Sequence, residues 1–148
     1  MHGIIQQLVK RYHTNCPFEL AERLGIRISF ESLGTETRGI YYPVLRRRFI
    51  VIDNSISAEW QRFVCAHELG HDRLHRGLAY YFIEKNSLFN VGKLEREANE
   101  FATKLLLYDA ELHNGCTKEN LLKEHRIPYE MIEHVGNYLE NEGDCLRG

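Results

Sequence analysis

The chain contains a histidine pair, His67 and His71, spaced one helical turn apart, with Glu68 directly after the first ring. Residues four apart on an α-helix lie on the same face, so both imidazoles could bind one metal ion. Histidines in this spacing are typical of a zinc site, and the carboxylate beside them can act as a base on a metal-held water. The motif therefore constrains residues 67–71 to a helix with a metal on one face.

The residues before the motif indicate that its helix belongs to the core. Trp60, Phe63, Val64 and Leu69 follow the spacing of a buried helical face. A buried histidine must be hydrogen-bonded or bound to a metal, and two of them beside a carboxylate are difficult to satisfy without a cation. The alternative interpretation is an ordinary pair of solvated or core histidines, because the HExxH pattern also occurs by accident.

A second amphipathic helix, at residues 94–107, carries candidates for the third ligand that a catalytic zinc needs. Glu95 could complete a site of two histidines and one glutamate. Asn99, one turn later, could hydrogen-bond a ligating ring and fix its orientation. Glu97 is the rival ligand, and it lies about 200° around the helix from Glu95, so the two cannot both face one ion. A third alternative is that these polar residues only solvate the helix.

Local patterns predict an α+β fold. Alternating segments at residues 26–30, 39–42 and 48–52 predict a three-stranded sheet, to which a short fourth strand could be added. Helices are predicted at residues 3–12, from Pro17 to the residues before Gly25, from Ser57 to near Gly77, and, beyond Asp109, at 117–125 and 128–141. The sheet is expected to pack on the motif helix, with further helices behind it.

Composition predicts one small globular domain. The 148 residues are 43% hydrophobic, enough for a core, so we expect a single domain at 1–148 with its core at roughly 17–108 and a helical part at 109–148. A net charge of −2 argues against direct binding to nucleic acid. The sequence has no long apolar stretch and no signal-peptide pattern, which predicts a cytoplasmic protein without a membrane segment.

The cysteines and the one basic run receive structural interpretations. Four cysteines are scattered without a C-x-x-C pair, so reduced thiols are expected, with Cys65 as a small buried core residue. The basic run at 46–48 follows Pro43 and precedes a strand. We interpret this run as a solvated turn in preference to an anion-binding or substrate-docking patch.

Four blocks, at residues 19–26, 49–53, 62–71 and 95–102, make the chain similar to the ImmA/IrrE-type metallopeptidases of bacteria, their mobile elements and phages. The resemblance covers roughly residues 17–108 and implies a minimal thermolysin-like zincin. In that pattern a glutamate on the following helix is the third ligand and an acid or amide one turn later braces the first histidine, and Glu95 and Asn99 match these positions. The chain departs from the pattern at residues 107–109, where relatives have a Met-Pro step.

The resemblance implies peptide-bond hydrolysis with one Zn²⁺ ion. Glu68 would take a proton from water and return it to the leaving amine. The developing oxyanion needs a further donor, for which Tyr80, Tyr81, His75 and a histidine of the C-terminal third are candidates that the sequence does not separate.

Relatives of this type typically act on a helix-turn-helix repressor, which makes a DNA-binding repressor of a phage or mobile element the expected protein substrate. The first alternative is a binding module, an antirepressor that sequesters the repressor while zinc serves structure. A peptidase of small peptides is a weaker alternative, since the chain has no second lobe to enclose a substrate. The intact Glu68 favours an enzyme, because a structural zinc site has no use for a base.

Overall fold

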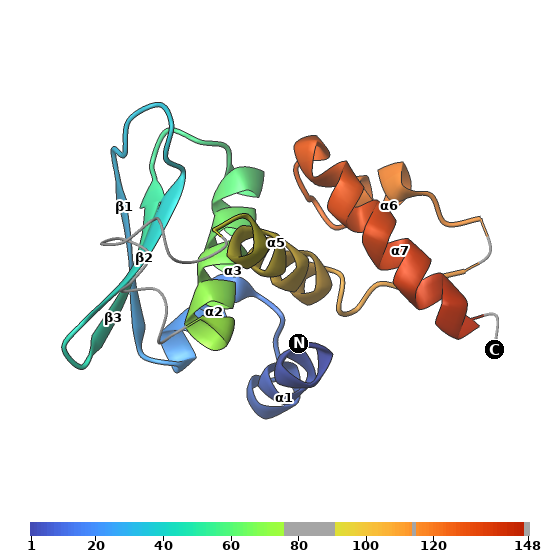
Figure 1. Cartoon of the computed structure of the whole chain (residues 1–148), viewed down its shortest axis with the longest axis horizontal. Helices are drawn as coiled ribbons and strands as arrows, with labels where there is room; N and C mark the ends of the chain where they lie inside the picture. Colours follow the sequence, from blue (N-terminus) through green and yellow to red (C-terminus); the bar gives the residue numbers. More distant parts are fainter. Residues whose placement is uncertain (76–90, 114, 147–148) are drawn as a thin grey trace.

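The computed structural model describes residues 1–75, 91–113 and 115–146 and has the α+β fold predicted from the sequence. In Figure 1 a twisted sheet forms one layer, and helix α3 (Ala58–Leu74) lies against it. Helix α5 (Val91–Leu106) packs on α3 away from the sheet. Helices α6 (Lys118–Glu124) and α7 (Ile132–Leu146) form the end of the molecule opposite the sheet (Figure 1).

The sheet contains the three strands expected from alternation, β1 (Ile26–Glu31), β2 (Gly39–Val44) and β3 (Arg47–Asp53). Their spatial order is β1-β3-β2, with β1 parallel and β2 antiparallel to β3. The central strand β3 is the most buried, as expected for a strand paired on both sides. No fourth strand occurs in the part of the chain that the structure describes. Strand β2 is therefore an edge strand beside α3.

The helix boundaries follow local signals at most positions. Helix α1 (His2–Tyr12) and helix α2 (Pro17–Arg23) occupy the predicted segments. At the start of α3 the Ser57 hydroxyl accepts a hydrogen bond from the Trp60 N–H at 3.2 Å, which satisfies a donor in the first helical turn. Helix α3 ends at Leu74, before the predicted Gly77. None of the described helices combines the length and apolar composition needed to cross a membrane.

The C-terminal helices differ in one respect from the prediction. Pro128 is predicted to start the last helix, but it precedes a short 3₁₀ helix, η1 (Tyr129–Met131), and α7 begins at Ile132. Proline suits the first turn of either helix type, because it has no N–H to donate and its φ is already near the helical value. The residue type alone therefore could not distinguish the two.

Part of the hydrophobic core lies between α3 and α5, which approach each other closely at Gly70. A Cβ atom at Gly70 would lie 3.1–3.3 Å from atoms of the Phe101 side chain, so close that the Phe101 ring would have to shift by a few tenths of an ångström. Glycine costs about 1 kcal/mol in a helix relative to alanine, so close packing explains its presence here. Phe101 and Leu69, both fully buried, belong to the same core. This packing holds the HExxH segment against α5.

The described cysteines agree with the expectation of reduced thiols. Cys16, Cys65 and Cys116 are all free. Cys65 is completely buried in the core, and this burial raises the pKa of its thiol well above the ordinary value. A buried thiol that resists ionisation is a poor nucleophile, which supports the structural interpretation of Cys65.

Candidate metal centre

Three side chains predicted as metal ligands converge between α3 and α5. The candidate ligand atoms of His67, His71 and Glu95 all lie within 4.8 Å of one another. Each imidazole Nε2 lies 3.1 Å from a Glu95 carboxylate oxygen, and the two Nε2 atoms are 3.2 Å apart. Tetrahedral ligands about 2.0–2.1 Å from a zinc ion are separated by roughly 3.3 Å. Glu95 contacts His67 through Oε2 and His71 through Oε1, so the two nitrogens and the carboxylate group lie at nearly the spacing that the ligands of one zinc ion would have.

Electrostatics also favour a cation among these groups. Partial burial acts to raise the pKa of Glu95, but hydrogen bonds with His67 and His71 lower it well below its ordinary value. Burial acts to lower the pKa of His67, yet the carboxylates of Glu95 and Glu68 raise it overall. The group thus stabilises positive charge at the point where the ligand atoms meet. A bound metal ion would supply that charge in place of a proton.

The ring of His67 is held by Asn99, as the helical spacing predicts. Its Nδ1 lies 2.8 Å from Asn99 Oδ1. An amide oxygen only accepts hydrogen bonds, so the ring must carry its hydrogen on Nδ1 and donate it to Asn99. The lone pair of Nε2 is then directed to the metal position, which is the tautomer that a zinc ligand needs.

Glu68 lies beside the candidate ligands but is not one of the three groups. Its side chain is nearly buried, with 7% of the residue exposed. Burial raises the pKa of Glu68, an effect that the neighbouring histidines and a backbone hydrogen bond from Tyr41 partly oppose. A carboxyl with a raised pKa is a better proton acceptor than a solvated one, so its environment suits a general base.

A glycine in β2 lets the sheet approach this carboxylate. A Cβ atom at Gly39 would lie 2.3 Å from Val64 Cγ1 and 3.2 Å from Glu68 Oε1, so any other residue would require the Val64 side chain or the strand itself to shift. Glycine within a strand often marks such a close approach. Beside Gly39 a cleft of about 330 Å³ opens onto His67, Glu68 and Glu95. The candidate base and ligands thus face a space that a substrate could enter.

The remaining predicted residues lie in different places. His75 is almost fully buried behind His71, and its Nε2 lies 2.8 Å from Glu97 Oε2. This position does not suit the oxyanion-donor role considered from the sequence, because His75 faces His71 and Glu97 instead of the cleft. Glu97, the rival ligand, is likewise not in the group of three. Tyr80 and Tyr81 lie outside the described residues.

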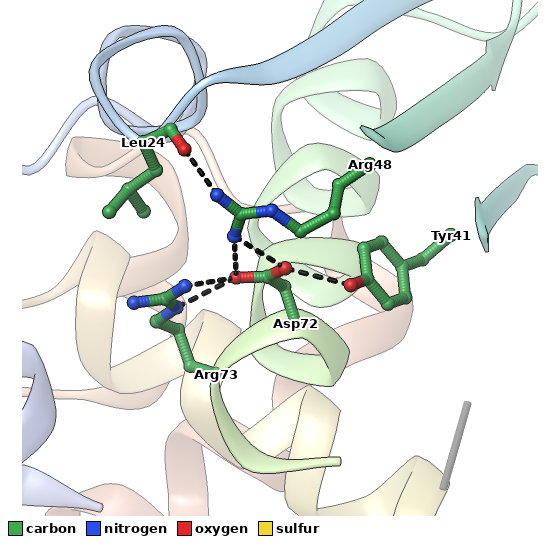
Figure 2. Close-up of polar contacts among 5 residues, drawn as sticks. All are labelled: Leu24, Tyr41, Arg48, Asp72 and Arg73. Carbon is green, nitrogen blue, oxygen red and sulfur yellow. Dashed lines mark hydrogen bonds and ion pairs between the residues drawn. The ribbon is translucent and has the colours of Figure 1, made fainter. Parts of the chain in front are cut away.

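A buried ion-pair network anchors the last turn of α3, next to His71. This network was not predicted from the sequence. Figure 2 shows the Asp72 carboxylate between side chains of β2, β3 and its own helix. Tyr41 of β2 donates its hydroxyl at 2.8 Å, Arg48 of β3 donates to both carboxylate oxygens at 2.9 Å, and Arg73 donates its Nε–H at 2.8 Å. Arg48 also donates to the Leu24 carbonyl at the end of α2.

This network corrects the interpretation of the basic run at 46–48 as a solvated turn. Arg48 is mostly buried and belongs to the sheet, although Arg46 and Arg47 are exposed. Burial acts to raise the pKa of Asp72, but the hydrogen bonds from Arg48, Tyr41 and Arg73 lower it overall. The signal available in the sequence was the position of Arg48 within an alternating strand.

We expect Asp72→Ala to destabilise the metal-free protein by about 3–5 kcal/mol, because it removes the buried carboxylate that pairs with the Arg48 guanidinium and accepts from the Tyr41 hydroxyl. Urea unfolding in the presence of a chelator measures this change. The control is Glu100→Ala, which removes a half-exposed carboxylate paired with Lys104 and should cost about 0.5 kcal/mol or less. Equal stability of the two variants would contradict the anchoring role of Asp72.

Known proteins provide independent evidence on the family. The profile of a peptidase family, described as the IrrE N-terminal-like domain, matches residues 21–135. The uncharacterized immunity region protein 2 of Bacillus phage phi105 is 41% identical over 105 residues, which cover 71% of this chain and 66% of that protein. Metallopeptidase ImmA of Bacillus subtilis (strain 168) is 28% identical over 130 residues, which cover 84% of this chain and 76% of ImmA. No solved structure matches the chain.

The chain therefore spans slightly less than two thirds of the phage relative and about three quarters of ImmA. The profile match includes both helices that carry the candidate ligands. Together, these matches place the chain in the ImmA/IrrE-type family of metallopeptidases.

Proposed function

We propose that this chain is a zinc-dependent endopeptidase that hydrolyses a specific protein, a helix-turn-helix repressor of a phage or mobile element. The observation that carries the proposal is the convergence of His67, His71 and Glu95 beside the buried Glu68 at an open cleft. Each of these features alone has a structural explanation. Their combination is typical of a hydrolytic zinc site.

The donor set supports zinc in a catalytic role. Two imidazole nitrogens and one carboxylate oxygen are the ligands of a known class of catalytic zinc sites, in which a further position stays open. A structural zinc is usually closed by four protein ligands, and the described residues offer a group of three. The cleft beside His67 leaves room for a substrate group at the remaining position.

The reaction needs a base close to the ligands, and the presence of Glu68 in the same cleft as His67 and Glu95 supports this role for it. A zinc ion held here would polarise the scissile carbonyl as a Lewis acid and make a water molecule more acidic. The Glu68 carboxylate would accept the proton of that water and donate it to the nitrogen of the leaving amine. Its partial isolation from solvent, which raises its pKa, supports both halves of this proton transfer. Asn99 keeps His67 in the required tautomer throughout.

Strand β2 suggests how an extended substrate segment could be aligned. It is paired with β3 on one side, and among the described strands nothing pairs with its other edge. Its first residue, Gly39, borders the cleft. A peptide that adds to this edge as a strand would be held by backbone hydrogen bonds with one of its carbonyls near the metal. This mode favours a flexible linker of a protein over a folded surface.

The relatives support a regulatory protein as the substrate. One is named an immunity region protein of a phage and the other a metallopeptidase. By analogy with them, a peptidase of a phage immunity region would act on the protein that maintains repression. Because such a repressor acts on DNA in the cytoplasm, the enzyme would act there too.

The alternative function is sequestration of the repressor without cleavage. It would leave Glu68 without a purpose, although keeping this carboxylate nearly buried costs the chain stability. We therefore favour hydrolysis. The two functions differ in one simple observable, the covalent integrity of the repressor.

Co-expression with the repressor encoded beside the gene tests the proposal. The wild-type chain and the Glu68→Gln chain are each expressed with the repressor, and the intact mass of the repressor is measured. We expect two repressor fragments with the wild type only. An intact repressor that co-purifies with both chains would support sequestration, and an intact repressor that binds neither chain would reject the proposed substrate.

A further inference from the structure

The second candidate ligand, His71, is contacted by a series of side chains different from the one that holds His67. The His71 Nδ1, on the ring side opposite the metal position, lies 3.0 Å from His75 Nδ1. The His75 Nε2 in turn lies 2.8 Å from the Glu97 carboxylate. His75 is 4% exposed and Glu97 about one third exposed. These contacts run from α3 to α5 through two rings.

The positions of the hydrogens in this chain follow from the metal-binding tautomer. If His71 binds a metal through Nε2, its neutral ring carries the hydrogen on Nδ1 and must donate it. His75 Nδ1 is the acceptor at that position, so His75 carries its own hydrogen on Nε2. That hydrogen is donated to the Glu97 carboxylate. Each of these two hydrogens then meets one acceptor, and with both rings neutral no other pair of tautomers preserves both contacts.

We propose that His75 and Glu97 are positioning residues that act together to orient His71 and fix its tautomer for metal binding. The inference rests on the proposed zinc site. Neither residue lines the cleft, since His75 lies behind His71 and Glu97 contacts His75. The ligand ring is thereby held from α5, as Asn99 of α5 holds His67. Helix α5 thus supplies one ligand and supports the other two.

Two other roles fit the geometry less well: metal binding by His75, and a surface ion pair formed by Glu97. His75 cannot bind the same ion, because it contacts the Nδ1 of His71 while the ligand group meets at Nε2. Glu97 is also 3.9 Å from Lys93, but that lysine is 65% exposed, and such a surface pair contributes little. A histidine that only fills space could be replaced by an apolar residue, whereas this one has both nitrogens engaged.

The test compares replacements of His75 that keep or remove the acceptor at the Nδ1 position. Asparagine places an oxygen where the Nδ1 atom was, whereas leucine fills similar space without an acceptor. Zinc affinity is measured by competition with a chromophoric chelator, and Co²⁺-loaded protein gives an absorption spectrum that reports ligand geometry. We expect His75→Leu to weaken zinc binding about 10- to 100-fold and alter the Co²⁺ spectrum. His75→Asn should restore most of the affinity.

Glu97 provides a second arm through a double-mutant cycle. We expect Glu97→Ala to weaken zinc binding by up to about 10-fold in the wild-type chain and to have almost no effect in the His75→Leu chain. Equal effects in both backgrounds would show that Glu97 does not act through His75 and would overturn the proposal. The control is Glu100→Ala on the same helix, which should leave zinc affinity unchanged, because Glu100 pairs with Lys104 and is not in the ligand group.

The arms also remain informative if one variant fails to fold. Circular dichroism checks each protein, and the single Glu97→Ala variant changes a partly exposed side chain that folding should tolerate. Unchanged affinity and an unchanged Co²⁺ spectrum in Glu97→Ala and His75→Leu would overturn the proposal. Failure of the wild-type chain to bind zinc would reject the proposed zinc site as well. Normal zinc results without repressor cleavage would reject only the proposed function.

Discussion

Glu68→Gln is expected to reduce hydrolysis by about 10²- to 10⁴-fold while the protein keeps its fold and its zinc. The amide is similar in size to the carboxyl but cannot accept a proton from water at neutral pH. Stability should not suffer, since burial already disfavours the charged form of Glu68 and a neutral side chain avoids that cost. The rate is measured with purified, zinc-loaded protein on the repressor or on a peptide that contains the scissile bond.

The matched control for this variant is Glu59→Gln. Glu59 is an exposed glutamate in the first turn of the same helix, so its replacement changes net charge equally without touching the cleft. It should keep the wild-type rate. A Glu68→Gln protein that retains the wild-type rate would remove Glu68 from the role of the base, whereas loss of zinc from this variant would show that the carboxylate helps to hold the metal.

Local features of the fold could be predicted because they depend on short-range physics. Alternation identified all three strands, and Pro17 and Ser57 identified two helix starts. The spacing on α5 also indicated that Glu95 and Asn99 lie on the same face of that helix. In the structure both contact His67, Glu95 at Nε2 and Asn99 at Nδ1. A helical period fixes the relative direction of side chains four apart, whatever the tertiary structure.

Contacts between distant segments could not be predicted in the same way. Arg48 and Asp72 are separated by 24 residues, and no local pattern pairs them. The spacing of His75 from His71 does not reveal whether His75 is buried or exposed. Its contact with Glu97 depends on how α5 packs against α3. Such pairings depend on strand order and helix packing, which a periodic pattern does not encode. The network around Asp72 and the support of His71 therefore emerged only from the structure.

The choice between Glu95 and Glu97 as the third ligand gives the other large expected effect. In the structure Glu95 is close to both imidazole Nε2 atoms, with 3.1 Å to each, whereas Glu97 contacts His75. We expect Glu95→Ala to lose zinc during purification, a loss well beyond the roughly 10- to 100-fold weakening caused by removing a group that only orients a ligand. The zinc content of the purified proteins, measured by elemental mass spectrometry, distinguishes Glu95 from Glu97 as the third ligand.

Glu97→Ala is the matched comparison, because it removes the same side chain two residues away on the same helix. It should retain about one zinc per chain, since Glu97 contacts His75 and not the ligand group. The opposite pattern, zinc lost with Glu97→Ala and kept with Glu95→Ala, would require α5 to turn by about 200° and would contradict the packing of Phe101 on Gly70. The metal assay thus tests the orientation of α5 together with the identity of the ligand.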